Sequence, residues 1–114
     1  MALKGEIFEA VSADLADDAS LTVRPSGAGA EVWVDTIVHS TGGTDVTQLE
    51  VYMVNAGGTD LVMNGDEFPQ LNYKKGIAYI GQRISYTNYL TVKNVSGDAK
   101  LFVGAFGIVT HDAD

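Results

Sequence analysis

Histidine, serine and carboxylate side chains are the groups in this chain that could perform nucleophilic, acid–base or metal chemistry. The sequence has two histidines, His39 and His111, and no cysteine. Thiolate nucleophiles, thiolate metal sites and disulfides are therefore excluded. The histidines lack the short spacing of a metal-ligand motif, and no nucleophile elbow or phosphate-binding glycine loop is present. We expect independent surface or capping histidines, no metal site, no cofactor and no enzymatic activity.

Two acidic stretches could bind a cation or supply an acid–base pair. Asp14, Asp17 and Asp18 are clustered, but they lack the glycine and the terminal glutamate of an EF-hand loop. Asp66 and Glu67 lie in a glycine-flanked turn, which does not shield one carboxyl as a glycosidase acid requires. We interpret both stretches as exposed turns. A small hydrolase is the third functional hypothesis, and only scattered Ser, His and Asp residues support it.

Three tyrosines suggest a different function. Tyr79, Tyr86 and Tyr89 lie close together in the sequence, and a row of exposed aromatic rings can stack on sugar rings. The competing interpretation is that these rings fill the core or a subunit interface. A carbohydrate-binding β-sandwich module is therefore one alternative function, with these tyrosines as the sugar-stacking candidates and a glycan as the partner.

The elements that must position these residues are β-strands. Short apolar runs recur about every ten residues, Gly-rich turns separate them, and no run has helical spacing. The pattern predicts an all-β fold, an antiparallel β-sandwich of jelly-roll-like or Ig-like type with about eight strands and little or no helix. We expect strands at residues 20–24, 31–40, 48–55, 61–63, 77–80, 83–87, 89–95 and 99–110.

Glycine-containing turns predict two hairpins. The sequence Gly-Gly-Thr-Asp occurs twice, at residues 42–45 and 57–60, and the second copy joins the runs 51–54 and 61–63. We interpret the repeat as a shared need for a turn that visits positive φ, with an internal duplication as the alternative. The turn Ser96-Gly97-Asp98 joins residues 89–95 to residues 99–110, which predicts a second hairpin.

The last expected strand is apolar on both faces. One face carries Leu101, Val103, Ala105 and Val109. The other carries Phe102, Phe106 and Ile108. A strand that is apolar on both faces is covered on both faces. We expect the second cover to be another subunit or a segment such as the N-terminal arm. Gly104 and Gly107 are predicted to leave gaps where that partner approaches closely.

The expected strand at residues 31–40 has the same property. Val32, Val34 and Val38 share one face, and Trp33, Ile37 and His39 share the other. Together the two strands define the candidate subunit-interface residues: Trp33, Ile37, Phe102, Phe106 and Ile108.

Length and charge limit the remaining possibilities. A chain of 114 residues predicts one domain over residues 1–114, with residues 1–19 as an extended arm and 111–114 as a frayed tail. The net charge of −8 disfavours nucleic-acid binding and is interpreted as solubility or docking on a basic partner. No apolar run is long enough to cross a bilayer, and the first residues lack the apolar core of a signal peptide. We expect synthesis in a cytoplasm.

The order of the pieces is similar to that of a known class of proteins. Leu21-Thr22-Val23-Arg24-Pro25 precedes a Glu-Val-Trp-Val-Asp-Thr-Ile-Val strand, two Gly-Gly turns follow, and a late strand ends in Gly107-Ile108-Val109. This order resembles small β-sandwich virion proteins of tailed bacteriophages, the accessory head or tail proteins. The resemblance implies a non-enzymatic structural subunit of the virion, a capsid decoration protein that assembles as a homo-oligomer, or alternatively a tail or fibre component. The implied partners are further copies of the chain and major virion proteins.

Overall fold

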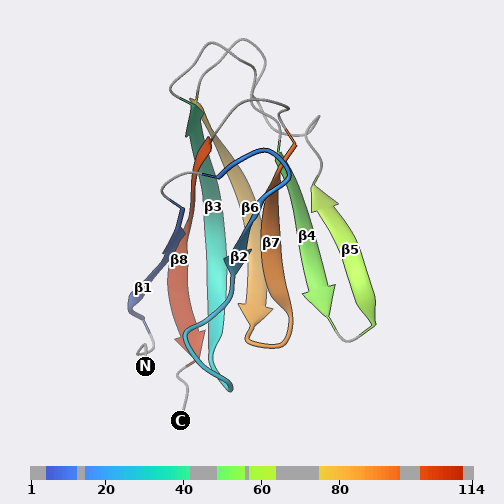
Figure 1. Cartoon of the computed structure of the whole chain (residues 1–114). Coiled ribbons are helices and arrows are strands. Elements are labelled where there is room, and N and C mark those ends of the chain that lie inside the picture. Colours follow the sequence, from blue (N-terminus) through green and yellow to red (C-terminus); the bar gives the residue numbers. More distant parts are fainter. Residues whose placement is uncertain are drawn as a thin grey trace.

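The computed structural model describes residues 5–12, 15–41, 49–55, 57–63, 75–95 and 101–111. All regular elements in these residues are strands, as the sequence predicts (Figure 1). Their bounds are β1 (Ile7–Val11), β2 (Ser20–Val23), β3 (Glu31–Thr41), β4 (Leu49–Asn55), β5 (Gly58–Met63), β6 (Lys75–Ser85), β7 (Tyr89–Asn94) and β8 (Leu101–His111).

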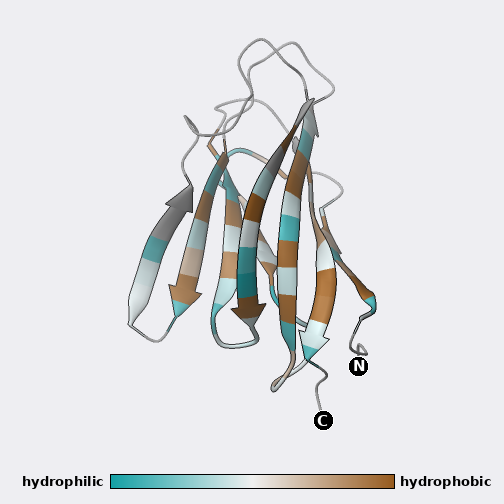
Figure 2. Ribbon diagram, turned by 180° about the vertical axis from the view of Figure 1, so that it is seen from behind, coloured by the Kyte–Doolittle hydropathy of each residue, from teal (hydrophilic) through white to brown (hydrophobic). Residues whose placement is uncertain are grey.

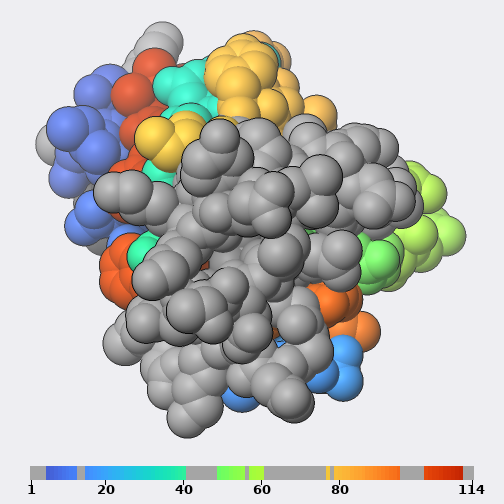
Figure 3. All heavy atoms as spheres, turned by 90° about the horizontal axis from the view of Figure 1, so that it is seen from above, coloured from blue at the N-terminus to red at the C-terminus, as the bar shows by residue number. Residues whose placement is uncertain are grey.

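The strands form two four-stranded antiparallel sheets packed face to face. The first sheet has the order β1-β8-β3-β6 and the second has the order β2-β7-β4-β5. Figure 3 shows the two layers end-on, with the colours of β1, β8, β3 and β6 along one side of the molecule. The first four strands thus pair in reverse order with the last four, from β4 with β5 outward to β1 with β8. This is the connectivity of a jelly roll, which confirms the predicted sandwich and selects one of its two expected types.

The two predicted hairpins have different outcomes. β4 and β5 pair directly through the turn at Gly58, as predicted. The predicted hairpin of residues 89–95 with 99–110 is wrong, because β7 pairs with β2 and β4 whereas β8 pairs with β1 and β3 in the other sheet. In a jelly roll this connection crosses between the layers. The turns expected at residues 42–45, 64–67 and 96–98, and the tail at 112–114, lie outside the described residues.

β6 is one strand where two were expected. Residues 77–80 and 83–87 were predicted as separate strands around Gly81, but β6 runs without a break from Lys75 to Ser85. Gly81 has φ +53°, a conformation that glycine adopts at low cost. It lies where β6 has two residues opposite a single residue of β3. The glycine therefore forms a bulge inside the strand rather than a break between strands.

A bulge in β3 reverses the expected faces of that strand. Val34 lies opposite Gly107 of β8, but the next pair is Thr36 with Phe106, so Asp35 is an extra residue. An extra residue shifts the alternation of side chains by one position. The prediction that Trp33, Ile37 and His39 share a face is therefore wrong.

The bulge determines which residues of β3 are buried and which face outward. Val32 and Val34 are buried before the bulge, and Ile37 and His39 are buried after it. Trp33 and Val38 are on the opposite, outer side. Ile37 is 0% exposed, so this candidate interface residue belongs to the core.

The core lies between the inner faces of the two sheets. Its members are aliphatic, apart from Phe8, and come from β1, the β1–β2 connection, β2, β3, β4, β6, β7 and β8: Phe8, Leu15, Val23, Val32, Val34, Ile37, Leu49, Val51, Ile80, Ile84, Leu90, Val92, Val103, Ala105 and Val109. A fully buried side chain of this kind contributes roughly 1.5–3 kcal/mol. Figure 2 shows that apolar segments recur along each strand of the first sheet.

Backbone and side-chain hydrogen bonds close one end of the sandwich. The buried Asn94 donates from Nδ2 to the Leu15 carbonyl at 2.9 Å, and its N–H donates to the Ala19 carbonyl at 3.0 Å.

Ser12 exchanges hydrogen bonds with the backbone of Val103 beyond the end of β1. β1 therefore lies beside β8 as an edge strand and does not lie over the outer face of β8.

Candidate subunit interface

Large apolar side chains that remain exposed gather on one surface of the sandwich. The described exposed ones are Ile7, Val11, Ile77, Tyr79, Tyr86, Phe102 and Ile108. All except Tyr86 belong to strands of the first sheet. The pairing register decides whether they share its outer face.

Residues that are directly opposite in an antiparallel pair point to the same face. The register places them in four rows across β1, β8, β3 and β6. The first row is Ile7, Ile108, Trp33 and Arg83. The second is Glu9, Phe106, Thr36 and Tyr79. The third is Val11, Gly104, Val38 and Ile77. The fourth contains Phe102 and Ser40.

These rows alternate with the buried pairs, so they form the outer face of the first sheet. We call its apolar members the apolar face: Ile7, Val11, Trp33, Val38, Ile77, Tyr79, Phe102, Phe106 and Ile108. Three of them are largely solvent-exposed, Ile7 at 77%, Tyr79 at 67% and Ile77 at 66%. A contiguous apolar surface on this scale is a sign of an interaction site.

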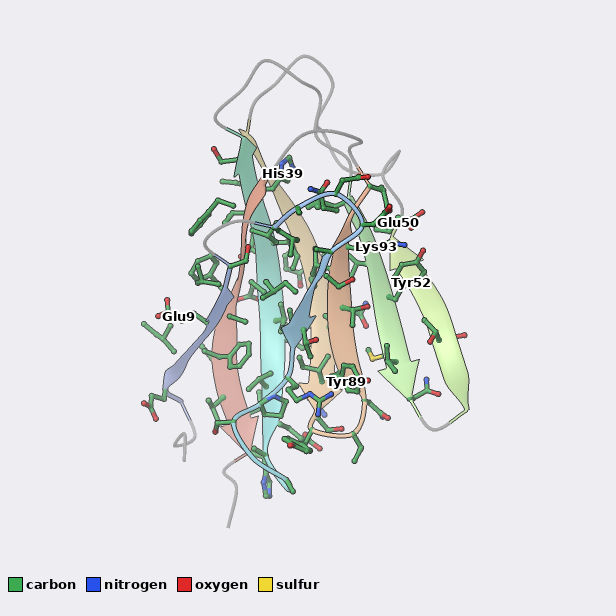
Figure 4. The ribbon with its side chains drawn as sticks, viewed as in Figure 1. Glu9, His39, Glu50, Tyr52, Tyr89 and Lys93 are labelled. Carbon is green, nitrogen blue, oxygen red and sulfur yellow. The ribbon has the colours of Figure 1, made fainter. Side chains whose placement is uncertain are left out.

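The outer face of the second sheet has the opposite character. Its rows contain Ser20 with Lys93 and Glu50, and Thr22 with Thr91 and Tyr52. Tyr52 donates from its hydroxyl to the Glu50 carboxylate at 2.5 Å, and this hydrogen bond raises the pKa of Tyr52 above 10.0. Figure 4 shows Glu50, Tyr52 and Lys93 grouped on this side of the sandwich. A polar outer face of this kind suits contact with water.

Intrachain contacts hold the aromatic rings of the apolar face in place. The Trp33 indole N–H donates to Asp35 Oδ1 at 2.5 Å, and the bulge keeps both side chains on the outer side. The Phe106 ring lies over Gly104, where an added Cβ would be 2.7 Å from it. The Tyr79 ring lies over Gly81 in the same way, with its nearest carbons 2.7 Å from an added Cβ. These rings have less freedom to lose when a partner binds.

The predicted gaps at Gly104 and Gly107 are therefore filled within the chain. The Phe106 ring occupies the space at Gly104. At Gly107 an added Cβ would lie 1.8 Å from the carbonyl oxygen of Trp33, so the backbone of β3 fills that space. The prediction that a partner enters these gaps is wrong, because both glycines already accommodate neighbours of their own chain.

The sequence-based interface candidates mostly converge. Trp33, Phe102, Phe106 and Ile108 all lie on the apolar face, and only Ile37 does not. Sequence reasoning missed Ile7, Val11, Val38 and Ile77, and it assigned Tyr79 to sugar binding. The available sequence signal was the even spacing of apolar residues, with Ile7 and Val11 four residues apart and Ile77 and Tyr79 two residues apart.

The three tyrosines of the carbohydrate hypothesis do not form one platform. Tyr79 lies on the outer face of the first sheet, whereas Tyr89 belongs to β7 in the second sheet. Tyr86 and Tyr89 are both engaged by Arg24, whose guanidinium carbon is 4.9 Å and 3.8 Å from their ring centroids. Two of the rings therefore pack against a cation of the same chain, and the third is on another face.

The structure separates the two histidines. His39 is buried, and desolvation lowers its pKa below 6.5. The expectation that His39 is a surface or capping histidine is wrong, because the bulge in β3 turns its side chain inward. His111 is exposed at the end of β8. Within the described residues no three His, Cys, Asp or Glu side chains gather as a metal site. None of those residues forms a helix that could cross a membrane.

Comparisons with known proteins identify the fold. The chain matches no protein-family model and no curated protein sequence. It is similar to the core of Drosophila NLP, whose crystal structure is described as giving insight into pentamer formation and histone binding by that protein. The TM-score is 0.53 and the identity is 12%, over 90% of this chain and 97% of that one. It is also similar to the nucleoplasmin-like N-terminal domain of Drosophila FKBP39, with a TM-score of 0.51, 8% identity and coverage of 100% and 96%. A chain of infectious bursal disease virus, Gx strain, matches with a TM-score of 0.41 and 10% identity, over 97% of this chain and 30% of that one. At these identities the two Drosophila structures show that the chain has the same β-sandwich fold.

Proposed function

We propose that this chain is a non-enzymatic structural subunit that associates with copies of itself through the apolar face, and that it serves as an accessory subunit of a tailed-bacteriophage virion. The observation that carries the proposal is the contrast between the outer faces. The outer face of the first sheet exposes Ile7, Ile77 and Tyr79, while the second sheet exposes polar side chains. A subunit that remained alone would leave the first face in water.

The size of the apolar face is suited to a protein partner. Four strands about 4.8 Å apart and four rows about 6.8 Å apart cover roughly 500 Å² before side-chain relief is counted. Each partner in a standard protein–protein interface contributes about 600–1,000 Å². Tryptophan, tyrosine and phenylalanine are the residue types enriched in such interfaces, and this face contains Trp33 and Phe106 on its central strands and Tyr79 on the edge strand β6.

A second copy of the chain is the occupant that we propose. The face is a broad, shallow sheet surface, and an identical sheet is complementary to it in shape and apolar character. Self-association also agrees with the pentamer formation described for the Drosophila NLP core. The net charge of −8 keeps separate subunits soluble until they assemble.

The virion role rests on the fold and on the sequence resemblance. Jelly rolls occur in viral capsid proteins, where the sandwich is a building block, although a fold alone does not specify a function. A capsid decoration protein is the favoured role, and a tail or fibre component is the alternative. Virions produced from the genome that encodes the chain should contain it in stoichiometric amounts by mass spectrometry. Particles that lack it would refute the virion role and leave self-association untouched.

Self-association is tested by sedimentation velocity over a dilution series from 100 µM downward. Trp33 is the single tryptophan and lies on the apolar face, so its emission should shift to shorter wavelengths as association buries it. Ile77→Asp adds a charge at a position that is 66% exposed in the single chain. It should prevent association and leave the melting temperature of the monomer nearly unchanged. Thr22→Asp, on the outer face of the second sheet, is the matched control and should associate normally.

Two results would contradict this proposal. A wild-type chain that stays monomeric at 100 µM would remove self-association. An Ile77→Asp variant that keeps the oligomeric mass would show that copies meet elsewhere. Phe106→Asp is a second variant that should prevent association. It should also lower the stability of the monomer, because it removes the ring that covers Gly104.

Docking on a basic protein is a second candidate, favoured by the net charge of −8 and by the histone binding described for the Drosophila NLP core. Binding of this kind depends on complementary charge and weakens in salt. Purified core histones are the probe, in pull-downs at 0.15 M and 0.5 M NaCl. Retention at the lower salt and loss at the higher salt would support it, and no retention at 0.15 M would exclude histone-like partners.

A further inference from the structure

Two charged residues lie at opposite edges of the apolar face. Glu9 is exposed on β1, and Arg83 is exposed on β6. In Figure 4 the Glu9 side chain extends away from the sandwich at the β1 edge. Three strand spacings separate the two edges, which is about 14 Å. The β1 edge of the face therefore has a negative charge at Glu9, and the β6 edge has a positive charge at Arg83.

Neither charge is neutralised within the described part of the chain. No ion pair or hydrogen bond joins the Glu9 carboxylate or the Arg83 guanidinium to a described residue. Asp35, one of the carboxylates of β3, accepts the Trp33 indole hydrogen bond. Glu31 lies near Arg83 and lines a shallow hollow of about 160 Å³ with it, without forming an ion pair. Both edges therefore have charges available to a partner.

We infer that a second copy stacks on the apolar face with its β1 over β6 of the first copy, so that Glu9 of each copy pairs with Arg83 of the other. This inference rests on the self-association proposed above and adds the orientation of the two copies. A two-fold axis that lies in the interface and runs parallel to the strands produces this arrangement.

The other simple two-fold arrangement has the axis across the strands. It brings β1 over β1 and β6 over β6, so that Glu9 faces Glu9 and Arg83 faces Arg83. Like charges placed together oppose association, whereas opposite charges favour it and fix orientation. Glu9 and Arg83 lie in adjacent rows, about 7 Å apart along the strands, and their long side chains can cover that offset. The charge pattern therefore selects the first arrangement.

Charge reversal tests this orientation. Glu9→Arg and Arg83→Glu should each weaken self-association by about tenfold or more, because each places like charges together twice. The double variant Glu9→Arg with Arg83→Glu should return the dissociation constant to within about threefold of wild type. An equimolar mixture of the two single variants should associate more tightly than either variant alone. Lys93→Glu, on the second sheet, is the control and should leave the constant unchanged.

The possible results separate this inference from the proposed function. A Glu9→Arg variant that associates as tightly as wild type would agree with β1 over β1, where like charges face each other before and after the reversal, and would overturn the inference. Losses that simply add in the double variant, or single reversals without effect in a chain that Ile77→Asp dissociates, would also overturn it while self-association stands. A wild-type chain that never associates would overturn both. Melting temperatures of all variants should match wild type, since Glu9 and Arg83 are exposed in the single chain.

Discussion

Gly107 of β8 lies against the backbone of Trp33 in β3, so closely that an added Cβ would be 1.8 Å from the Trp33 carbonyl oxygen and 2.9 Å from the Val34 Cα. The contact occurs at the bulge where Asp35 is the extra residue of β3. The bulge bends the backbone of β3 toward β8, and only a residue without a side chain fits beneath it. The same bulge decides which face Trp33 and Ile37 occupy.

Gly107→Ala should therefore destabilise the fold severely. The methyl group would collide with backbone atoms, which cannot rotate aside, so β3 and β8 must separate locally. We expect a loss of about 3 kcal/mol or more in the free energy of unfolding, measured by urea denaturation. Gly57→Ala is the control, because its Cβ would meet only Asn55 Oδ1 at 3.4 Å. Equal stabilities of the two variants would show that the bulge is not as tight as described.

Stability should fall in mild acid because of His39. Burial lowers the pKa of His39 below 6.5, so the unfolded chain binds a proton at a higher pH than the folded chain does. The free energy of unfolding is then fully retained above pH 6.5 and falls as the pH drops toward the folded-state pKa, by up to about 1.4 kcal/mol per pH unit.

Denaturation of wild type and His39→Gln at pH 7.5 and pH 5.5 tests this effect. The difference in stability between the two pH values should be smaller in His39→Gln, since one titrating group is removed. His111→Gln, at the exposed histidine, is the control for a His→Gln change outside the core. A His39→Gln variant with the full wild-type difference would assign the pH dependence to other groups.

Asn94 should be important for closing the end of the sandwich. Its buried side chain donates to the Leu15 carbonyl at 2.9 Å, and Asn94→Ala would leave that carbonyl without this donor. We expect a loss of about 1–3 kcal/mol in the free energy of unfolding. Asn88→Ala alters an exposed asparagine and should stay within about 0.5 kcal/mol of wild type. If both variants lose the same amount, the buried hydrogen bond is not the cause.

Arg24 should stabilise the fold through its aromatic neighbours. Its guanidinium carbon is 3.8 Å from the Tyr89 ring centroid and 4.9 Å from that of Tyr86. A double-mutant cycle with Arg24→Ala and Tyr89→Leu should give a coupling of about 0.5–1 kcal/mol. The cycle with Tyr86→Leu should give a smaller value because that ring is farther away. Zero coupling in the Tyr89 cycle would show that the contact between Arg24 and Tyr89 does not contribute to the free energy of unfolding.

The local pattern of the sequence was sufficient for the fold class and for much of the strand set. Alternating apolar residues and Gly-rich turns are short-range signals, and they predicted an all-β sandwich and most of its strands. The outward positions of Phe102, Phe106 and Ile108 also followed, because β8 keeps strict alternation from Phe102 to Val109. A glycine could be recognised as a break, but the sequence did not show that Gly81 sits within a single strand.

Tertiary structure alone decided the features that depend on which strands pair. The bulge at Asp35 moved Ile37 and His39 into the core, and it occurs where β3 lies against Gly107, which is far away in the sequence. β7 and β8 lie in different sheets, so they do not form the hairpin that the intervening turn predicted. Ile7 and Ile77 became part of one surface with Trp33 only because β1 and β6 flank β8 and β3. Register and strand order are non-local properties, since burial of the whole apolar set selects them, and no short stretch of sequence contains that information.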